Sequence, residues 1–119
     1  MKVKSIFFLL SILLALNSSC RRDTEDVIDC VTEAFFVGLT HSVDPGDSKK
    51  INFQINYSGA YAVTSVDWDY GDGNSESING TTAVHTYQQA GSFTVKAKVN
   101  IKNGSATCTI EPEKTITVN

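Results

Sequence analysis

Residues 93–101, FTVKAKVNI, place an apolar side chain at every odd position and a polar one at every even position. Successive side chains of a strand point to opposite faces, so a period of two gathers the apolar side chains on one face. The same alternation occurs in residues 51–57, INFQINY, and in residues 66–70, VDWDY. Each stretch therefore predicts a β-strand with one buried face and one solvated face.

Turn residues separate the predicted strands about every ten residues, which is typical of a β-sandwich. Asp44-Pro45-Gly46-Asp47 forms a turn signal before the strand at 51–57. From about Phe35 onward the period of two dominates, and no segment after Cys20 shows a helical period. The fold class expected from this pattern is an all-β sandwich.

The C-terminal region predicts a hairpin followed by an edge strand. Asn103-Gly104 is suited to the positive φ angles of a two-residue turn, which would pair residues 93–101 with residues 105–110. In that register Cys108 lies opposite Val99 and points into the core. Pro112 has no N–H to donate to a ladder, so the last strand, resuming at residues 114–118, is expected at a sheet edge.

The N-terminus has the pattern of a secretory signal peptide. Lys2 and Lys4 precede an apolar run at residues 6–16, about half of the ~20 residues that a membrane-spanning helix needs. The run leads into LNSSC at residues 16–20, which resembles the lipobox of bacterial lipoproteins. The resemblance implies cleavage after residue 19 and a lipid on the Cys20 thiol, so that the chain is anchored to a membrane. Ordinary secretion with an incidental cysteine is the alternative.

A polar segment follows the predicted lipidation site. Residues 21–26, RRDTED, favour a flexible tether, which we place at residues 20–30, before a domain at residues 31–119. Its acidic cluster resembles the surface-export signals of some Gram-negative lipoproteins, which implies an outer-membrane lipoprotein exposed at the cell surface. A periplasm-facing protein with an ordinary polar tether is the alternative.

Composition restricts the partners and the redox compartment. Removing the signal peptide takes away two lysines and leaves eight basic side chains against 13 acidic ones, which argues against a nucleic-acid partner because a phosphate backbone requires a basic face. With Cys20 lipidated, Cys30 and Cys108 remain as one pair, and export favours a disulfide between them. Two free buried thiols are the alternative, and no histidine stands at metal-ligand spacing from either cysteine.

Three motifs in order resemble those of the PKD domain (polycystic-kidney-disease type), an immunoglobulin-like β-sandwich. They are WDYGDG at residues 68–73, HTY at residues 85–87 and GSFTV at residues 91–95. The resemblance covers about residues 35–118. It implies a single sandwich domain of a kind that is generally non-catalytic and contacts glycans or proteins.

The motif residues are expected to build the fold. Trp68 should fill the space between the sheets, and Tyr87 stands where a tyrosine-corner residue would send its hydroxyl back to the backbone. Asp72 can accept backbone N–H groups across the turn, and His85 is expected to bond to that turn. The structural motif comprises Trp68, Asp69, Gly71, Asp72, Gly73, His85, Tyr87 and Gly91.

The acidic residues of the motif do not form a recognisable catalytic set. Asp69, Asp72 and His85 are accompanied by no Ser or Cys nucleophile and no Gly-rich oxyanion loop, so no enzymatic activity and no cofactor are expected. Calcium binding is the alternative, because carboxylate oxygens are ligands of calcium. We favour roles of these carboxylates in turns and on a solvated face, since Asp67 and Asp69 point from one face of a strand. The ligands that calcium would use are Asp67, Asp69 and Asp72, joined by Asp44 and Asp47.

Two function classes remain open, a binding module for a glycan or protein and a structural spacer or accessory subunit of an envelope complex. A glycan site needs exposed aromatic side chains, and Trp68 is committed to the core. Tyr61, in the loop at residues 57–61, and Phe36, out of phase with Phe35, are therefore the candidate ligand contacts. We expect the neighbouring sheet or the N-terminal segment to cover Phe36.

Overall fold

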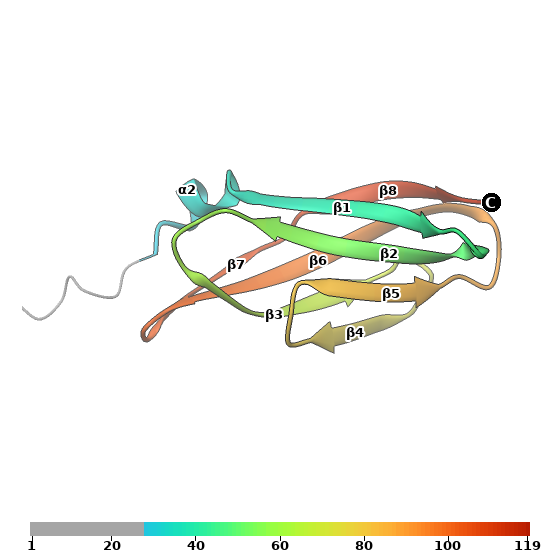
Figure 1. Cartoon of the computed structure of the whole chain (residues 1–119). Coiled ribbons are helices and arrows are strands. Elements are labelled where there is room, and N and C mark those ends of the chain that lie inside the picture. Colours follow the sequence, from blue (N-terminus) through green and yellow to red (C-terminus); the bar gives the residue numbers. More distant parts are fainter. Residues whose placement is uncertain (1–27) are drawn as a thin grey trace, which may run out of the picture.

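The computed structural model describes residues 28–119, which form one short helix and eight strands (Figure 1). The predicted signal peptide, the lipidation site Cys20 and most of the tether lie outside the described residues. Among residues 28–119, no helix is long and apolar enough to cross a membrane. The elements are α2 (Cys30–Ala34), β1 (Val37–Asp44), β2 (Asp47–Tyr57), β3 (Ala62–Asp69), β4 (Ser75–Ile78), β5 (Thr82–Thr86), β6 (Gly91–Asn103), β7 (Ala106–Ile110) and β8 (Glu113–Val118).

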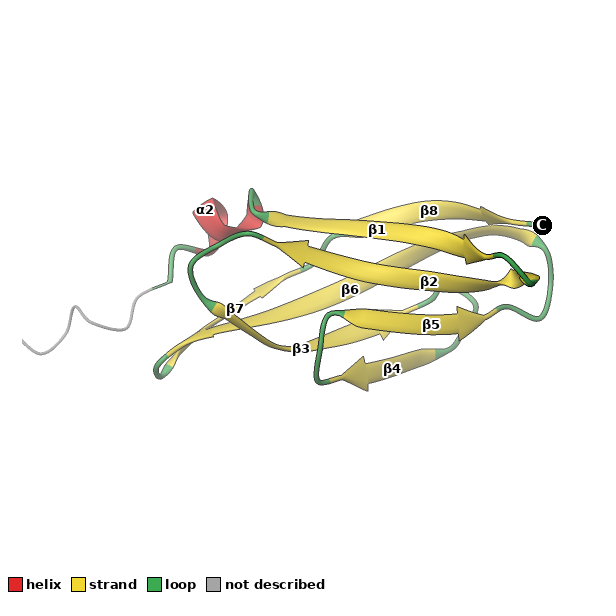
Figure 2. Cartoon of the chain, viewed as in Figure 1, coloured by secondary structure: helices red, strands yellow, loops and turns green. Residues whose placement is uncertain are grey.

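The strands form two antiparallel sheets that face each other (Figure 2). Sheet A has the order β1-β2-β5, and sheet B has the order β4-β3-β6-β7, with β8 also paired to β6. Hairpins join neighbours within a sheet. The chain passes from sheet A to sheet B between β2 and β3, returns between β4 and β5, and passes to sheet B again between β5 and β6. This architecture confirms the predicted all-β sandwich.

The apolar members of the alternating stretches meet between the two sheets. Trp68 on β3 is 1% exposed, and its ring centroid lies 5.6 Å from that of Phe53 on β2, so the aromatic pair joins the sheets. Burial of one large apolar side chain stabilises a fold by about 1.5–3 kcal/mol. The buried apolar residues are Ile51, Phe53, Ile55, Val66, Trp68, Tyr70, Ala83, Tyr87, Val95, Ala97, Val99, Ile101, Cys108, Ile116 and Val118.

The β6–β7 hairpin differs from the predicted register. Asn103 pairs with Ala106, so the two-residue loop starts at Gly104, and Cys108 lies opposite Ile101 rather than Val99. Gly104 has a φ of 61°, and among the described residues no residue other than glycine has a positive φ. A turn with glycine first avoids the steric cost that Asn103 would bear in the predicted turn. The shift is by two residues, so Cys108 keeps its inward orientation and is 3% exposed.

Pro112 divides the last edge strand into β7 and β8. Both strands pair with the same side of β6, with β7 along residues 99–103 and β8 along residues 91–96. Between them, the N–H of Ala97 donates to the carbonyl of Pro112 at 3.0 Å. Within the described chain β8 pairs only with β6, so its predicted edge position is confirmed.

The helix α2 was not expected, because five residues are too few to show a helical period. The carboxylate of Asp29 caps it by accepting the N–H groups of Val31 at 3.2 Å and Thr32 at 3.3 Å. Ile28 packs against the core. The described contacts of the sandwich therefore reach back to residues 28–30, next to the predicted domain boundary at residue 31.

Candidate functional site

The end of β3 forms a turn that is held by carboxylates. Asp69 accepts the N–H of Gly71 at 3.0 Å, and Asp72 accepts the N–H of Asn74 at 3.1 Å. The second oxygen of Asp72 lies 2.7 Å from Nε2 of His85. The turn therefore links the end of β3 in sheet B to β5 in sheet A.

Two glycines permit this turn. Gly71 has a φ of 79° and Gly73 has a φ of 90°, values that side chains disfavour. A Cβ on Gly71 would also lie 2.5 Å from the carbonyl oxygen of Thr94 on β6, whereas a Cβ on Gly73 would meet nothing within 4 Å. Gly71 is thus needed for both its conformation and the space that it leaves.

Aromatic rings enclose His85. Its ring stacks on Tyr70 with centroids 4.0 Å apart and meets the edge of Tyr87 at 4.7 Å. The Tyr87 hydroxyl donates to the backbone carbonyl of Tyr70 at 2.8 Å, the kind of bond that defines a tyrosine corner. Burial raises the pKa of both Tyr70 and Tyr87 above the ordinary tyrosine value, so both phenols stay neutral donors.

The ionisation of Asp72 is set by its hydrogen bonds. Burial acts to raise the pKa of this carboxyl, but the bonds from His85 and Asn74 outweigh it and hold the pKa below its ordinary value. Both oxygens of Asp72 are thus engaged within the turn. These groups connect the turn after β3 to β5.

The carboxylates considered for calcium lie in different places. Asp67 and Asp69 belong to the outer face of sheet B, where Asp67 accepts the hydroxyl of Ser77 at 2.7 Å. Asp44 and Asp47 lie at the β1–β2 turn. Among residues 28–119, no three His, Cys, Asp or Glu side chains are grouped so that they could hold a metal ion.

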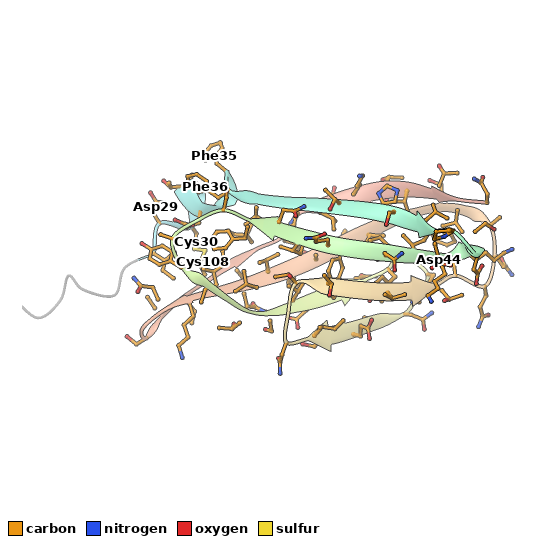
Figure 3. The ribbon with its side chains drawn as sticks, viewed as in Figure 1. Asp29, Cys30, Phe35, Phe36, Asp44 and Cys108 are labelled. Carbon is orange, nitrogen blue, oxygen red and sulfur yellow. A yellow bond between two sulfur atoms is a disulfide. The ribbon has the colours of Figure 1, made fainter. Side chains whose placement is uncertain are left out.

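The remaining motif residue, Gly91, and one cysteine of the pair, Cys108, lie on sheet B. Gly91 is the first residue of β6 and stands opposite Val118. The disulfide between Cys30 and Cys108 is present, with Cα atoms 5.7 Å apart, which confirms the predicted pairing. It attaches α2 to β7 (Figure 3).

The two aromatic candidates for ligand contact differ in exposure. Phe36 is 43% exposed, so the neighbouring sheet leaves it partly open, while most of the N-terminal segment that was also expected to cover it lies outside the described residues. Phe35 is 84% exposed, because it ends α2 and precedes the alternation that begins with β1. Tyr61 is half-buried against the core, and its N–H donates to the Tyr57 hydroxyl at 3.2 Å. The structure therefore leaves Phe36 as the better placed of the two candidates.

An open groove of about 710 Å³ lies beside Phe36. We call it the Phe36 groove. Gly38 lies opposite Asn56 in the β1–β2 ladder and presents no side chain, so it leaves part of the groove open. The groove is lined by residues that include Phe36, Gly38, Gln54, Asn56, Ser58 and Thr81.

The groove opens onto a part of the outward face of sheet A that carries no formal charge, and Lys50, on the same face, lies beyond this part toward the β1–β2 turn. We call this uncharged part the neutral face. The amide of Asn56 donates to the Thr40 hydroxyl at 3.0 Å, whereas the side chains of Asn52 and Gln54 bond to no other described residue and face solvent. The register places on the neutral face Gly38, Thr40, Ser42, Asn52, Gln54, Asn56, Thr82 and Val84.

The outer face of sheet B is different. Asp67 stands opposite Lys98, and Lys96 stands between Asp69 on β3 and Glu113 on β8. Opposite charges across strands are typical of a solvated surface. The contrast identifies the neutral face and the Phe36 groove as the candidate binding surface.

Sequence reasoning missed a buried carboxylate next to this groove. Glu33 on α2 is 7% exposed, and the Tyr57 hydroxyl donates to it. Burial and this bond raise the pKa of Tyr57. A Cβ on Gly59 would collide with a Glu33 oxygen and with the Tyr57 ring, so only glycine leaves room for the pair. No spacing in the sequence links these three residues, and only the Asp29 cap could have indicated the helix that carries Glu33.

The comparisons with known proteins agree on the family. A family model described as "PKD domain" matches residues 33–118. The crystal structure of the PKD1 domain of Vibrio anguillarum Epp is similar with a TM-score of 0.52 and 20% identity, covering 69% of this chain and 89% of that chain. At this identity the similarity shows the immunoglobulin-like fold alone. No curated protein matches. PKD domains are generally non-catalytic modules, and the chain described here belongs to the PKD domain family.

Proposed function

We propose that this chain is a cell-envelope lipoprotein whose PKD domain binds a neutral glycan at the cell surface. The observation that supports the ligand class is the neutral face, where amides and hydroxyls lie beside the exposed Phe36 ring. Lipidation of Cys20 would hold the domain on the outer membrane. The proposal includes neither a cofactor nor catalysis.

The chemistry of a sugar matches both parts of this surface. Sugar hydroxyls exchange hydrogen bonds with amides, and Asn52 and Gln54 direct theirs to solvent rather than to other described residues. The C–H face of a pyranose is apolar and can pack against an aromatic ring, here Phe36. A charged ligand would gain nothing from a face without formal charge, since fixed counter-charges are what recognise it.

Affinity electrophoresis in gels that contain soluble xylan, mannan, laminarin or dextran tests the glycan proposal. We expect at least one of these neutral polysaccharides to retard the wild-type domain. Phe36→Ala and Gln54→Ala should each weaken that binding, Phe36→Ala by about tenfold or more if the ring is an anchor, which corresponds to about 1.4 kcal/mol. Lys98→Ala, on the outer face of sheet B, is the matched control and should leave the mobility shift unchanged.

A result in which none of these polysaccharides is bound would contradict the glycan proposal. Binding that survives Phe36→Ala would show that the ligand contacts another surface. A domain that instead captures a defined envelope protein would be an accessory subunit or spacer.

The anchor is tested separately. Cys20→Ser should move the protein from the membrane fraction to the soluble fraction, because no other residue can take the diacylglyceryl thioether. Protease treatment of intact cells should degrade the wild-type domain if it faces outward. Unchanged membrane partition of Cys20→Ser, or full protection from protease, would contradict lipidation or surface exposure respectively.

A further inference from the structure

The helix α2 exposes an apolar face at one end of the domain. Val31 and Phe35 are four residues apart and lie on the same side of the helix. They are 74% and 84% exposed, the two highest values among the large apolar side chains that the structure exposes. We call this pair the α2 patch.

The opposite side of α2 is fastened to the sandwich. Cys30 is bonded to Cys108 on β7, and the buried Glu33 accepts the Tyr57 hydroxyl. The helix therefore cannot rotate to bury the α2 patch without breaking both attachments. An apolar surface held outward in this way costs free energy in water unless another apolar phase covers it.

The α2 patch lies at the end of the domain where the chain enters it. In Figure 3, Asp29, Cys30 and Phe35 gather at this end, whereas Asp44 lies at the opposite end. Cys20 precedes Ile28 by eight residues, and eight residues reach at most about 29 Å when fully extended. A lipid on Cys20 would therefore keep Ile28 within this distance of the bilayer, and the α2 patch, which begins three residues later, close to the bilayer at a high effective concentration.

We propose that Val31 and Phe35 insert into the outer part of the bilayer that holds the lipid of Cys20, and thereby orient the domain on the membrane. This inference rests on the proposed lipid anchor. The exposed carboxylate of Asp29 caps the same helix, so the contact is apolar and does not depend on anionic lipid. The Phe36 groove then opens close to the membrane surface, next to the inserted pair.

The test attaches the mature chain to vesicles without relying on lipidation in cells. Cys30 and Cys108 share the disulfide, so Cys20 is the single free thiol of residues 20–119. It can be coupled to a maleimide phospholipid in phosphatidylcholine vesicles, with or without dibromo-phosphatidylcholine as a quencher. Tryptophan is introduced by Phe35→Trp or, as a matched control on β5, by Val84→Trp, a position that is 51% exposed. The signal of the buried Trp68 is subtracted with the wild-type protein.

Phe35→Trp should show blue-shifted emission, strong quenching by the brominated lipid and at least about twofold less quenching by aqueous iodide than Val84→Trp. The bromolipid quenching should persist at high salt, because the contact is apolar. Equal iodide quenching of Phe35→Trp and Val84→Trp would overturn the inference. So would bromolipid quenching of Phe35→Trp that stays the same when Val31→Ser is added to that variant. Failure of the lipoprotein proposal is detected by a different experiment, cell fractionation, in which the wild-type protein would then be found in the soluble fraction.

Discussion

Substitution of Gly71 and Gly73 separates backbone conformation from space at the turn that follows β3. Both glycines have positive φ, so alanine at either position costs about 1–2 kcal/mol in conformational strain. Only at Gly71 does the new Cβ meet a backbone atom, the Thr94 oxygen at 2.5 Å. Thr94 is paired with Thr115 on β8, so it cannot move without disturbing that ladder, and overpacking of this kind costs about 1–3 kcal/mol more.

Gly73→Ala should therefore lower the free energy of unfolding by about 1–2 kcal/mol, and Gly71→Ala should lower it by at least about 1 kcal/mol more. For a domain of this size, each 1 kcal/mol corresponds to roughly 4–8 °C in Tm. Urea unfolding followed by the emission of Trp68, the single tryptophan and a core residue, measures both variants. Equal destabilisation of the two variants would refute the argument that Gly71 makes room for β6.

Three further predictions concern the Asp72 carboxylate, calcium and the disulfide. Because hydrogen bonds hold the pKa of Asp72 below the ordinary value of about 3.9 despite burial, its stabilising contribution is complete above that pH and disappears as pH falls through the folded-state pKa. Asp72→Asn should thus have a free energy of unfolding about 1–3 kcal/mol lower than that of the wild type at pH 7. Urea unfolding measures this difference, and a difference that does not become smaller toward pH 2 would contradict the prediction. Excess calcium should leave the wild-type Tm unchanged, and calorimetry showing a rise of several degrees would favour a calcium site. The disulfide closes a separation of 78 residues, so replacing Cys30 and Cys108 by serine should cost up to about 4.5 kcal/mol, and mass spectrometry should find neither thiol alkylated before reduction.

The core was predictable because alternation is a local signal. Every odd residue from Val95 to Ile101 is buried, as the pattern of residues 93–101 requires. The hairpin register was less predictable, because Asn103-Gly104 and Gly104-Ser105 are both acceptable two-residue turns. The two registers differ by two residues and bury the same faces, so the hydrophobic pattern could not choose between them.

The candidate site was only partly predictable for a different reason. Phe36 could be selected from its phase, but its exposure depends on whether another segment covers it, which a strand pattern does not report. The pairing of Glu33 with Tyr57 joins residues 24 positions apart through a helix too short to have a period. The neutral face could not be predicted from the sequence either, because its residues become neighbours only when β1, β2 and β5 are placed in register.

The disulfide also determines how a mechanical load enters the domain. β1 is an edge strand that pairs only with β2 among the described strands, so without the disulfide a pull on its start would act on the β1–β2 hydrogen bonds alone. Cys30 precedes β1 and is bonded to Cys108, so tension arriving through the N-terminal chain passes into β7 instead. β7 starts at the end that holds α2 and runs along β6 away from it (Figure 1), so the tension acts along the strand, in shear, on several hydrogen bonds at once. A domain that is tethered at this end can therefore carry a pulling force on a bound ligand through β7, and the β1–β2 hydrogen bonds do not carry that force alone.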